Sequence, residues 1–77
     1  MNIEPNSKLQ YKDGKRRITI LFGNLVVGKG IFFDVNIKQA SQNRTFRGGY
    51  YIAGALNPVD AHPDTVEMLN AAIAANS

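Results

Sequence analysis

Residues 16–38 read RRITILFGNLVVGKGIFFDVNIK, and this stretch decides the fold of the chain. In Arg16–Phe22 and in Ile31–Lys38, every second side chain is apolar. A period of two is typical of a β-strand that buries only one face. The residues predicted to face the core are Ile18, Ile20, Ile31, Phe33, Val35 and Ile37.

Glycines separate these strands. Asp13-Gly14 is a strong signal for a two-residue hairpin, and Gly23-Asn24 predicts a second tight turn. Gly28-Lys29-Gly30 predicts either a further turn or a kink in a strand. Residues 23–30 also approximate a phosphate-binding loop. Gly30 stands where that loop needs Ser or Thr, and a β-rich run follows instead of a helix, so we interpret these residues as hairpin glycines.

The remaining segments complete a single small domain. Residues 1–7 read as a flexible polar tail, and the domain itself covers residues 8–77. Strands are expected over about residues 8–54. A final strand at 45–53 would place Tyr50 with the apolar residues and Tyr51 on the opposite face.

A C-terminal helix is expected over about residues 65–75. Prolines before it interrupt regular structure, and Asp64 is predicted to be its N-cap. An apolar stripe on this helix should pack on the sheet, because so short a helix is marginal alone. The predicted fold class is α+β: a four- or five-stranded antiparallel sheet followed by one helix packed on one face.

The charges are divided along the chain. Residues 1–47 hold all nine Lys and Arg against three acidic residues, a balance of +6, whereas residues 48–77 hold three acidic residues and no base. The basic part is also the β-rich part. A sheet with a positive surface, backed by a neutral-to-acidic helix, is a charge distribution suited to a polyanion.

Composition excludes several kinds of site. With no Cys, the chain cannot form disulfides, zinc–thiolate sites or thiol nucleophiles. The N-terminal residues lack the pattern of a signal peptide, and no apolar run reaches the ~20 residues of a membrane helix. We therefore expect a cytoplasmic protein without a membrane partner, in the host cytoplasm if the protein is viral.

The candidate site is a basic and aromatic sheet face. Cations interleaved with aromatic rings suit a single strand of nucleic acid, because charges follow phosphates and rings stack on bases. The alternative is an ordinary solvated face with basic edges that oppose aggregation. The predicted nucleic-acid-binding residues are Lys12, Lys15, Arg16, Arg17, Phe32, Lys38, Arg47 and Tyr51.

Two other motifs have simpler interpretations. Gly48-Gly49, after Arg47, is expected to form a bulge that accommodates a partner strand. Asp60 and Asp64 surround the only His, His62, which could suggest a metal or acid–base site. We interpret the two carboxylates as a turn residue and a helix cap. The sequence thus predicts no catalytic residue, no metal and no cofactor, and hence no enzyme.

The basic strand-rich half, Leu56-Asn57-Pro58 and the terminal helix together resemble the positive-cofactor-four and Whirly type of single-stranded DNA-binding domain. The resemblance concerns layout over residues 16–75, with an additional segment at Val59–Pro63. It implies a curved sheet, dimerisation through the helix and a strand held on the basic face. The residues it implies for binding are Arg17, Phe32, Lys38, Arg47 and Tyr51.

The expected function is binding of single-stranded DNA or RNA with low sequence specificity. A homodimer is expected because one short helix barely covers the sheet. The alternative is a small viral or plasmid accessory protein that binds and modulates a host protein complex. In that case the interface would be the sheet edge or the exposed aromatic residues.

Overall fold

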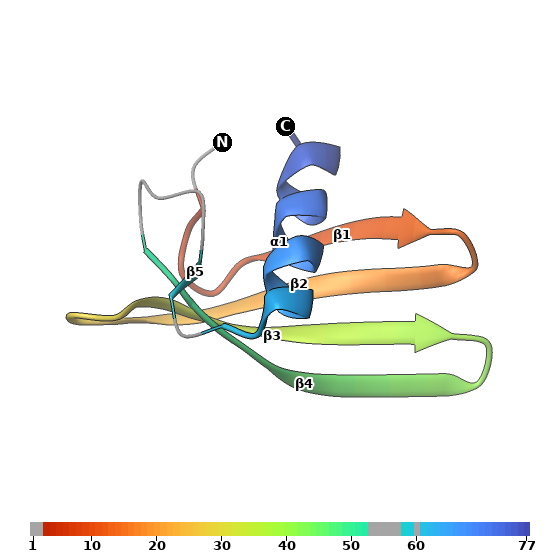
Figure 1. Ribbon diagram of the computed structural model, residues 1–77, viewed down its shortest axis with the longest axis horizontal. Helices are drawn as coiled ribbons and strands as arrows, with labels where there is room; N and C mark the ends of the chain where they lie inside the picture. Colours follow the sequence, from red (N-terminus) through yellow and green to blue (C-terminus); the bar gives the residue numbers. More distant parts are fainter. Residues whose placement is uncertain (1–2, 53–57, 60) are drawn as a thin grey trace.

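The computed structural model describes residues 3–52, 58, 59 and 61–77. Its strands form one antiparallel sheet in the order β1-β2-β3-β4-β5, and the helix α1 lies across one face of that sheet (Figure 1). The predicted α+β class, with a sheet followed by one packed helix, is confirmed. The elements are β1 (Lys8–Asp13), β2 (Arg16–Val26), β3 (Gly30–Gln39), β4 (Gln42–Tyr51), β5 (Pro58–Val59) and α1 (Pro63–Ala75).

The core lies between α1 and the sheet. Strand register brings the alternating apolar residues into cross-strand pairs such as Ile20 with Val35 and Phe22 with Phe33. The two phenylalanine rings are 6.1 Å apart at a tilt of 52°, an arrangement that aromatic pairs favour. Leu69 and Ala72 complete the core from the helix. The predicted core residues are buried, except that Ile37 is only partly buried.

The β2–β3 hairpin differs from the prediction. Gly23-Asn24 does not form a turn, because β2 continues to Val26 with a register irregularity between Phe22 and Leu25. The chain reverses around Gly28, so of the two predictions for Gly28-Lys29-Gly30 the turn is confirmed. Gly28 has a φ of 83°, the left-handed conformation that glycine adopts at little cost. A side chain at Gly23 would overlap the Phe32 ring. Gly23 therefore serves to admit an aromatic ring within a strand.

A bulge in β4 decides which tyrosine is buried. Phe33 pairs with Gly49 and Asp34 pairs with Arg47, so Gly48 is an additional residue in β4. The predicted bulge is confirmed, but its effect on the following residues was missed. Tyr51 is only 7% exposed and belongs to the core, so its predicted place on the binding face is wrong.

The start of α1 also differs from the prediction. His62, not Asp64, is the N-cap, and its Nδ1 accepts a hydrogen bond of 3.2 Å from the Asp64 backbone N–H. Pro63 at the first helical position favours this start, because its fixed φ suits a helix and it has no N–H to satisfy. The buried Thr65 hydroxyl lies 2.7 Å from the His62 carbonyl oxygen and 3.1 Å from the Gly48 carbonyl oxygen, so it contacts both the start of α1 and the β4 bulge.

Residues 3–7, predicted to be part of a flexible tail, are attached to the sheet. The Asn6 backbone N–H donates to the Gly23 carbonyl at 3.0 Å, and the Phe22 N–H donates to the Ser7 carbonyl at 2.8 Å. Ile3 packs against the core. Among the described residues, no helix is long and apolar enough to span a membrane.

Candidate nucleic-acid interface

The face of the sheet opposite α1, here called the open face, has an ordered arrangement of side chains. The strand registers place its residues in rows that cross β1 to β4. The first row, at the β1–β2 and β3–β4 turns, is Lys12, Arg17, Lys38 and Asn43; the second is Gln10, Thr19, Asn36 and Thr45; the third is Lys8, Leu21, Asp34 and Arg47. Beyond the third row, Phe32 pairs with Tyr50.

The first row is basic and continues into a depression. Lys12, Arg17 and Lys38 are cross-strand neighbours, so adjacent backbones are about 5 Å apart. The β1–β2 and β3–β4 turns lie at the same end of the sheet (Figure 1). Beside them is a cavity of about 440 Å³, here called the basic notch, and none of the carboxylates that the structure describes lines it. Its lining residues are Lys12, Gly14, Lys15, Arg16, Arg17, Lys38 and Ala40.

The opposite end of the open face is aromatic. The half-buried Phe32 ring occupies the space above Gly23. Its cross-strand partner Tyr50 is also half-buried, and the Lys29 ammonium lies 5.1 Å from the centroid of the Tyr50 ring. Sequence reasoning missed Tyr50, and the only signal for it was the Gly48-Gly49 bulge that moves Tyr50 to this face.

The middle of the open face is polar and already internally bonded. The Asn36 Nδ2 donates to Asn43 Oδ1 at 2.6 Å and to Thr45 Oγ1 at 2.9 Å. Thr19 is buried despite lying on this face, and the Gln10 amide lies 3.4 Å from its hydroxyl. Side-chain hydrogen bonds therefore link neighbouring strands across the middle of the open face, between its basic and aromatic ends.

The charge on the open face is strongly positive. Its described residues include five cations and one carboxylate, that of Asp34. Asp34 is the cross-strand partner of Arg47, so it offsets part of the positive potential there, whereas Arg17 has a lysine on either side. The positive potential is therefore concentrated at the first row.

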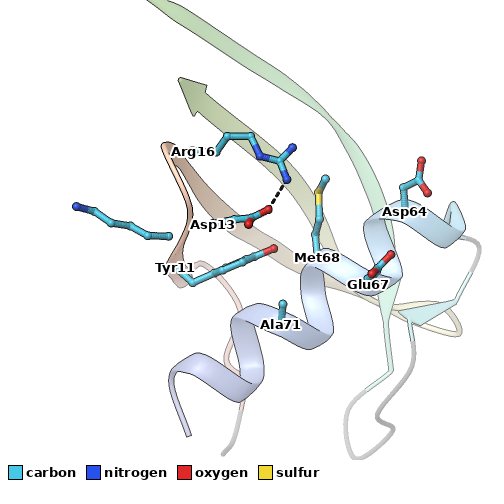
Figure 2. A pocket seen from close by; sticks show the side chains of 8 residues that line it. Tyr11, Asp13, Arg16, Asp64, Glu67, Met68 and Ala71 are labelled. Carbon is cyan, nitrogen blue, oxygen red and sulfur yellow. Dashed lines mark hydrogen bonds and ion pairs between the residues drawn. The ribbon is translucent and has the colours of Figure 1, made fainter. Parts of the chain in front are cut away.

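The helix side of the β1–β2 hairpin has a different character. Figure 2 shows Arg16 bonded to Asp13, on the side of the hairpin that faces α1. Residues of the hairpin and of α1 line a cavity of about 450 Å³ here. Three carboxylates and two cations line this cavity. Burial of the Tyr11 ring raises the pKa of its hydroxyl, and the Asp13 charge adds to this shift while Arg16 opposes it. The carboxylates make this side unsuitable for a polyanion. The residues that line the cavity are Tyr11, Lys12, Asp13, Arg16, Asp64, Glu67, Met68 and Ala71.

The histidine motif has a structural role. His62 Nδ1 lies 3.7 Å from Asp64 Oδ2 with both side chains exposed, and His62 caps α1. Asp60, also part of the candidate site, lies outside the described residues. Among residues that the structure does describe, no group of three potential ligands is placed to hold a metal ion.

The structure thus divides the eight predicted binding residues into groups. Lys12, Lys15, Arg17 and Lys38 meet at the basic notch, and Phe32 and Arg47 lie farther along the open face. Arg16 borders the notch but is bonded to Asp13 on the helix side, and Tyr51 is in the core.

Comparisons of the chain with protein-family models, curated proteins and solved structures found no match.

Proposed function

We propose that this protein binds single-stranded DNA or RNA on its open face, with low sequence specificity and without catalysis or a cofactor. One observation carries the proposal: a basic row and an aromatic pair lie on the same side of one sheet. Binding of a single strand needs both, because cations neutralise phosphates and aromatic rings stack on bases.

The spacing of these groups suits a strand of several nucleotides. Lys38 and Phe32 are six residues apart on β3, which corresponds to about 20 Å at 3.3 Å per residue. In this arrangement the backbone of the strand contacts Arg17 and its neighbours, and bases stack on Phe32 and Tyr50. The carboxylates on the helix side favour binding on the open face by repelling phosphates elsewhere.

Low sequence specificity follows from the polar middle. Asn36 and Thr45 could read base edges, but each already shares a hydrogen bond with the other. Breaking that bond would offset much of the free energy gained from a base contact. Stacking is tolerant of sequence, because every base has an aromatic face.

We also propose a homodimer in the cytoplasm. Phe46, on the face that α1 covers, remains 38% exposed, and with the partly buried Ile37 it lines a cavity of about 190 Å³ beyond the helix. A second copy packed there would complete the burial of this face and leave the open face free. Sedimentation should show a dimer for the wild-type protein and a monomer for Phe46→Glu. A wild-type monomer at high protein concentration would contradict this proposal.

A second candidate function is binding to a host protein, and an apolar surface at the β2–β3 turn favours it. Leu25 is 58% exposed and Val27 95% exposed there, and Ile52 lies beside them. Exposed apolar clusters of this kind are typical of protein contacts. In this case a salt-insensitive protein complex would be lost in Val27→Asp and retained in Arg17→Ala.

The proposed function is tested by fluorescence anisotropy with a labelled single-stranded oligonucleotide at low and at physiological salt. Arg17→Ala should weaken binding, because Arg17 lies in the centre of the basic row. Arg44→Ala is the matched control, because Arg44 pairs with Ile37 and lies on the other face. Arg44 also lines the cavity of the proposed dimer contact, so sedimentation should first show that Arg44→Ala has the same oligomeric state as the wild-type protein. No binding by the wild-type protein at low salt, or equal losses in both variants, would contradict the proposal.

A further inference from the structure

The basic notch differs from the rest of the open face in shape as well as in charge. It is a cavity lined by residues of the β1–β2 and β3–β4 hairpins, whereas the second and third rows lie on the sheet itself. It is lined by Lys12, Lys15, Arg16, Arg17 and Lys38. Of these five cations, only Arg16 forms an ion pair with Asp13 within the described part of the chain. The notch therefore carries a high density of positive charge: Asp13 offsets the charge of Arg16 from outside the notch, and among the described residues no carboxylate lines the notch itself.

We infer that the basic notch binds the terminal phosphate of a nucleic-acid strand. This inference rests on the proposed function and specifies which part of the strand is recognised. A terminal phosphate carries a charge of about −1.5 to −2 near pH 7 and has three acceptor oxygens. An internal phosphodiester has one charge and two free oxygens, so it gains less from several cations that converge in a concave site.

The position of the notch favours binding of the end of a nucleic-acid strand rather than its middle. The basic row lies at the edge of the open face, and beyond it the chain turns back at Gly14 and Ala40. A strand that extends from the aromatic pair toward this edge reaches the notch as it leaves the sheet. On the far side of the β1–β2 hairpin, Asp13, Asp64 and Glu67 line the other cavity and repel a strand that continues in that direction.

Ala40 gives the notch an unusual backbone. Ala40 is the first residue of the two-residue β3–β4 turn and has a φ of 54°. Two-residue hairpin turns with a positive φ at this position favour glycine there. A left-handed alanine costs free energy, and such conformations cluster at functional sites. Ala40 is thus a residue with an unfavourable backbone conformation that lines the notch.

The test compares single strands of one sequence and about ten nucleotides that differ only in their ends. One strand has hydroxyl ends, a second has a 5′-phosphate and a third has a 3′-phosphate. A fourth strand, with hydroxyl ends, is lengthened to match the charge of the phosphorylated strands. Anisotropy at low salt should show one phosphorylated strand binding roughly tenfold more tightly than the lengthened strand.

Two lysines on β1 supply matched variants. Lys12→Ala removes a cation from the notch, and Lys8→Ala removes one from the third row on the same face and strand. Lys12→Ala should abolish the preference for the terminal phosphate, whereas Lys8→Ala should retain it while binding all strands slightly less tightly. Equal affinity of the wild-type protein for phosphorylated and lengthened strands would overturn this inference and leave the proposed function intact. Absence of binding to every strand would overturn the proposed function and this inference with it.

Discussion

Gly48→Ala should destabilise the protein through steric overlap alone. A Cβ at this position would overlap two atoms of the Phe33 ring and lie 3.0 Å from a third, Cζ. Phe33 is fully buried, so its ring cannot move into solvent without leaving the core. Overpacking of this kind costs about 1–3 kcal/mol. A chain of 77 residues has a free energy of unfolding of only about 4–12 kcal/mol.

Urea unfolding followed by circular dichroism measures this effect. With an m value near 1 kcal/mol/M, a loss of about 2 kcal/mol lowers the midpoint by about 2 M. Phe33→Leu destabilises the protein by itself, because it shortens a fully buried side chain. In the double variant Gly48→Ala/Phe33→Leu it should nevertheless recover part of the loss caused by Gly48→Ala, because the smaller side chain leaves space for the added methyl group. The coupling free energy between the two sites should be about 0.5–3 kcal/mol.

Gly28→Ala is the control for this cycle. Gly28 has a φ of 83°, and no atom of the described residues lies within 4 Å of its potential Cβ, so alanine there costs backbone energy without overlap. Phe33→Leu should not recover any stability lost in Gly28→Ala. An unchanged midpoint for Gly48→Ala, or the same recovery in both double variants, would refute the account of the β4 bulge.

Further predictions concern the helix, the turn and the pH dependence. Leu69→Asp should unfold the domain, because it places an unpaired charge in the core; a folded variant with a near-native melting temperature would show that α1 is not docked. His62→Ala should cost about 1 kcal/mol as a lost N-cap and leave oligonucleotide binding unchanged; lost binding in a folded variant would reveal a functional role for His62. Ala40→Gly should raise the melting temperature by relieving the left-handed conformation, and a lower melting temperature would contradict this account of the turn. Burial raises the pKa of Tyr11 in the folded state, so the neutral hydroxyl's contribution to the free energy of unfolding is complete below the unfolded pKa near 10 and is lost as pH rises further. Tyr11→Phe should therefore reduce the loss of stability at alkaline pH in unfolding experiments.

The sequence predicted the fold well where side-chain alternation was uninterrupted. Arg16–Phe22 and Ile31–Lys38 pair in the predicted orientation, because a period of two specifies which side faces the core. This orientation also places Arg17, Phe32 and Lys38 together on the open face. The basic notch depends in addition on the β1–β2 and β3–β4 turns meeting at one end, which follows from the meander topology rather than from any local motif.

The predictions failed where glycines alter the register. Gly23 was interpreted as a turn, but it admits the Phe32 ring within a strand. Gly48 shifts the pairing of β4 by one residue and exchanges Tyr50 with Tyr51. Both effects depend on an aromatic ring from the neighbouring strand β3, which alternation within one segment does not reveal. The cap at His62 was not predicted, because Asp is a commoner N-cap residue than His; the start of α1 is instead decided by Pro63, which favours the first helical position.

The most direct test of the central claim is the salt dependence of oligonucleotide binding in two variants of the open face. Arg17→Ala removes a phosphate contact, so the slope of log affinity against log salt should fall by roughly 0.7. Tyr50→Ala removes a stacking ring, so it should lose about 1–3 kcal/mol at every salt concentration with an unchanged slope. Tyr50→Phe, which keeps the ring, should bind almost as well as the wild-type protein. Wild-type affinity in both alanine variants would contradict the claim that the open face binds nucleic acid.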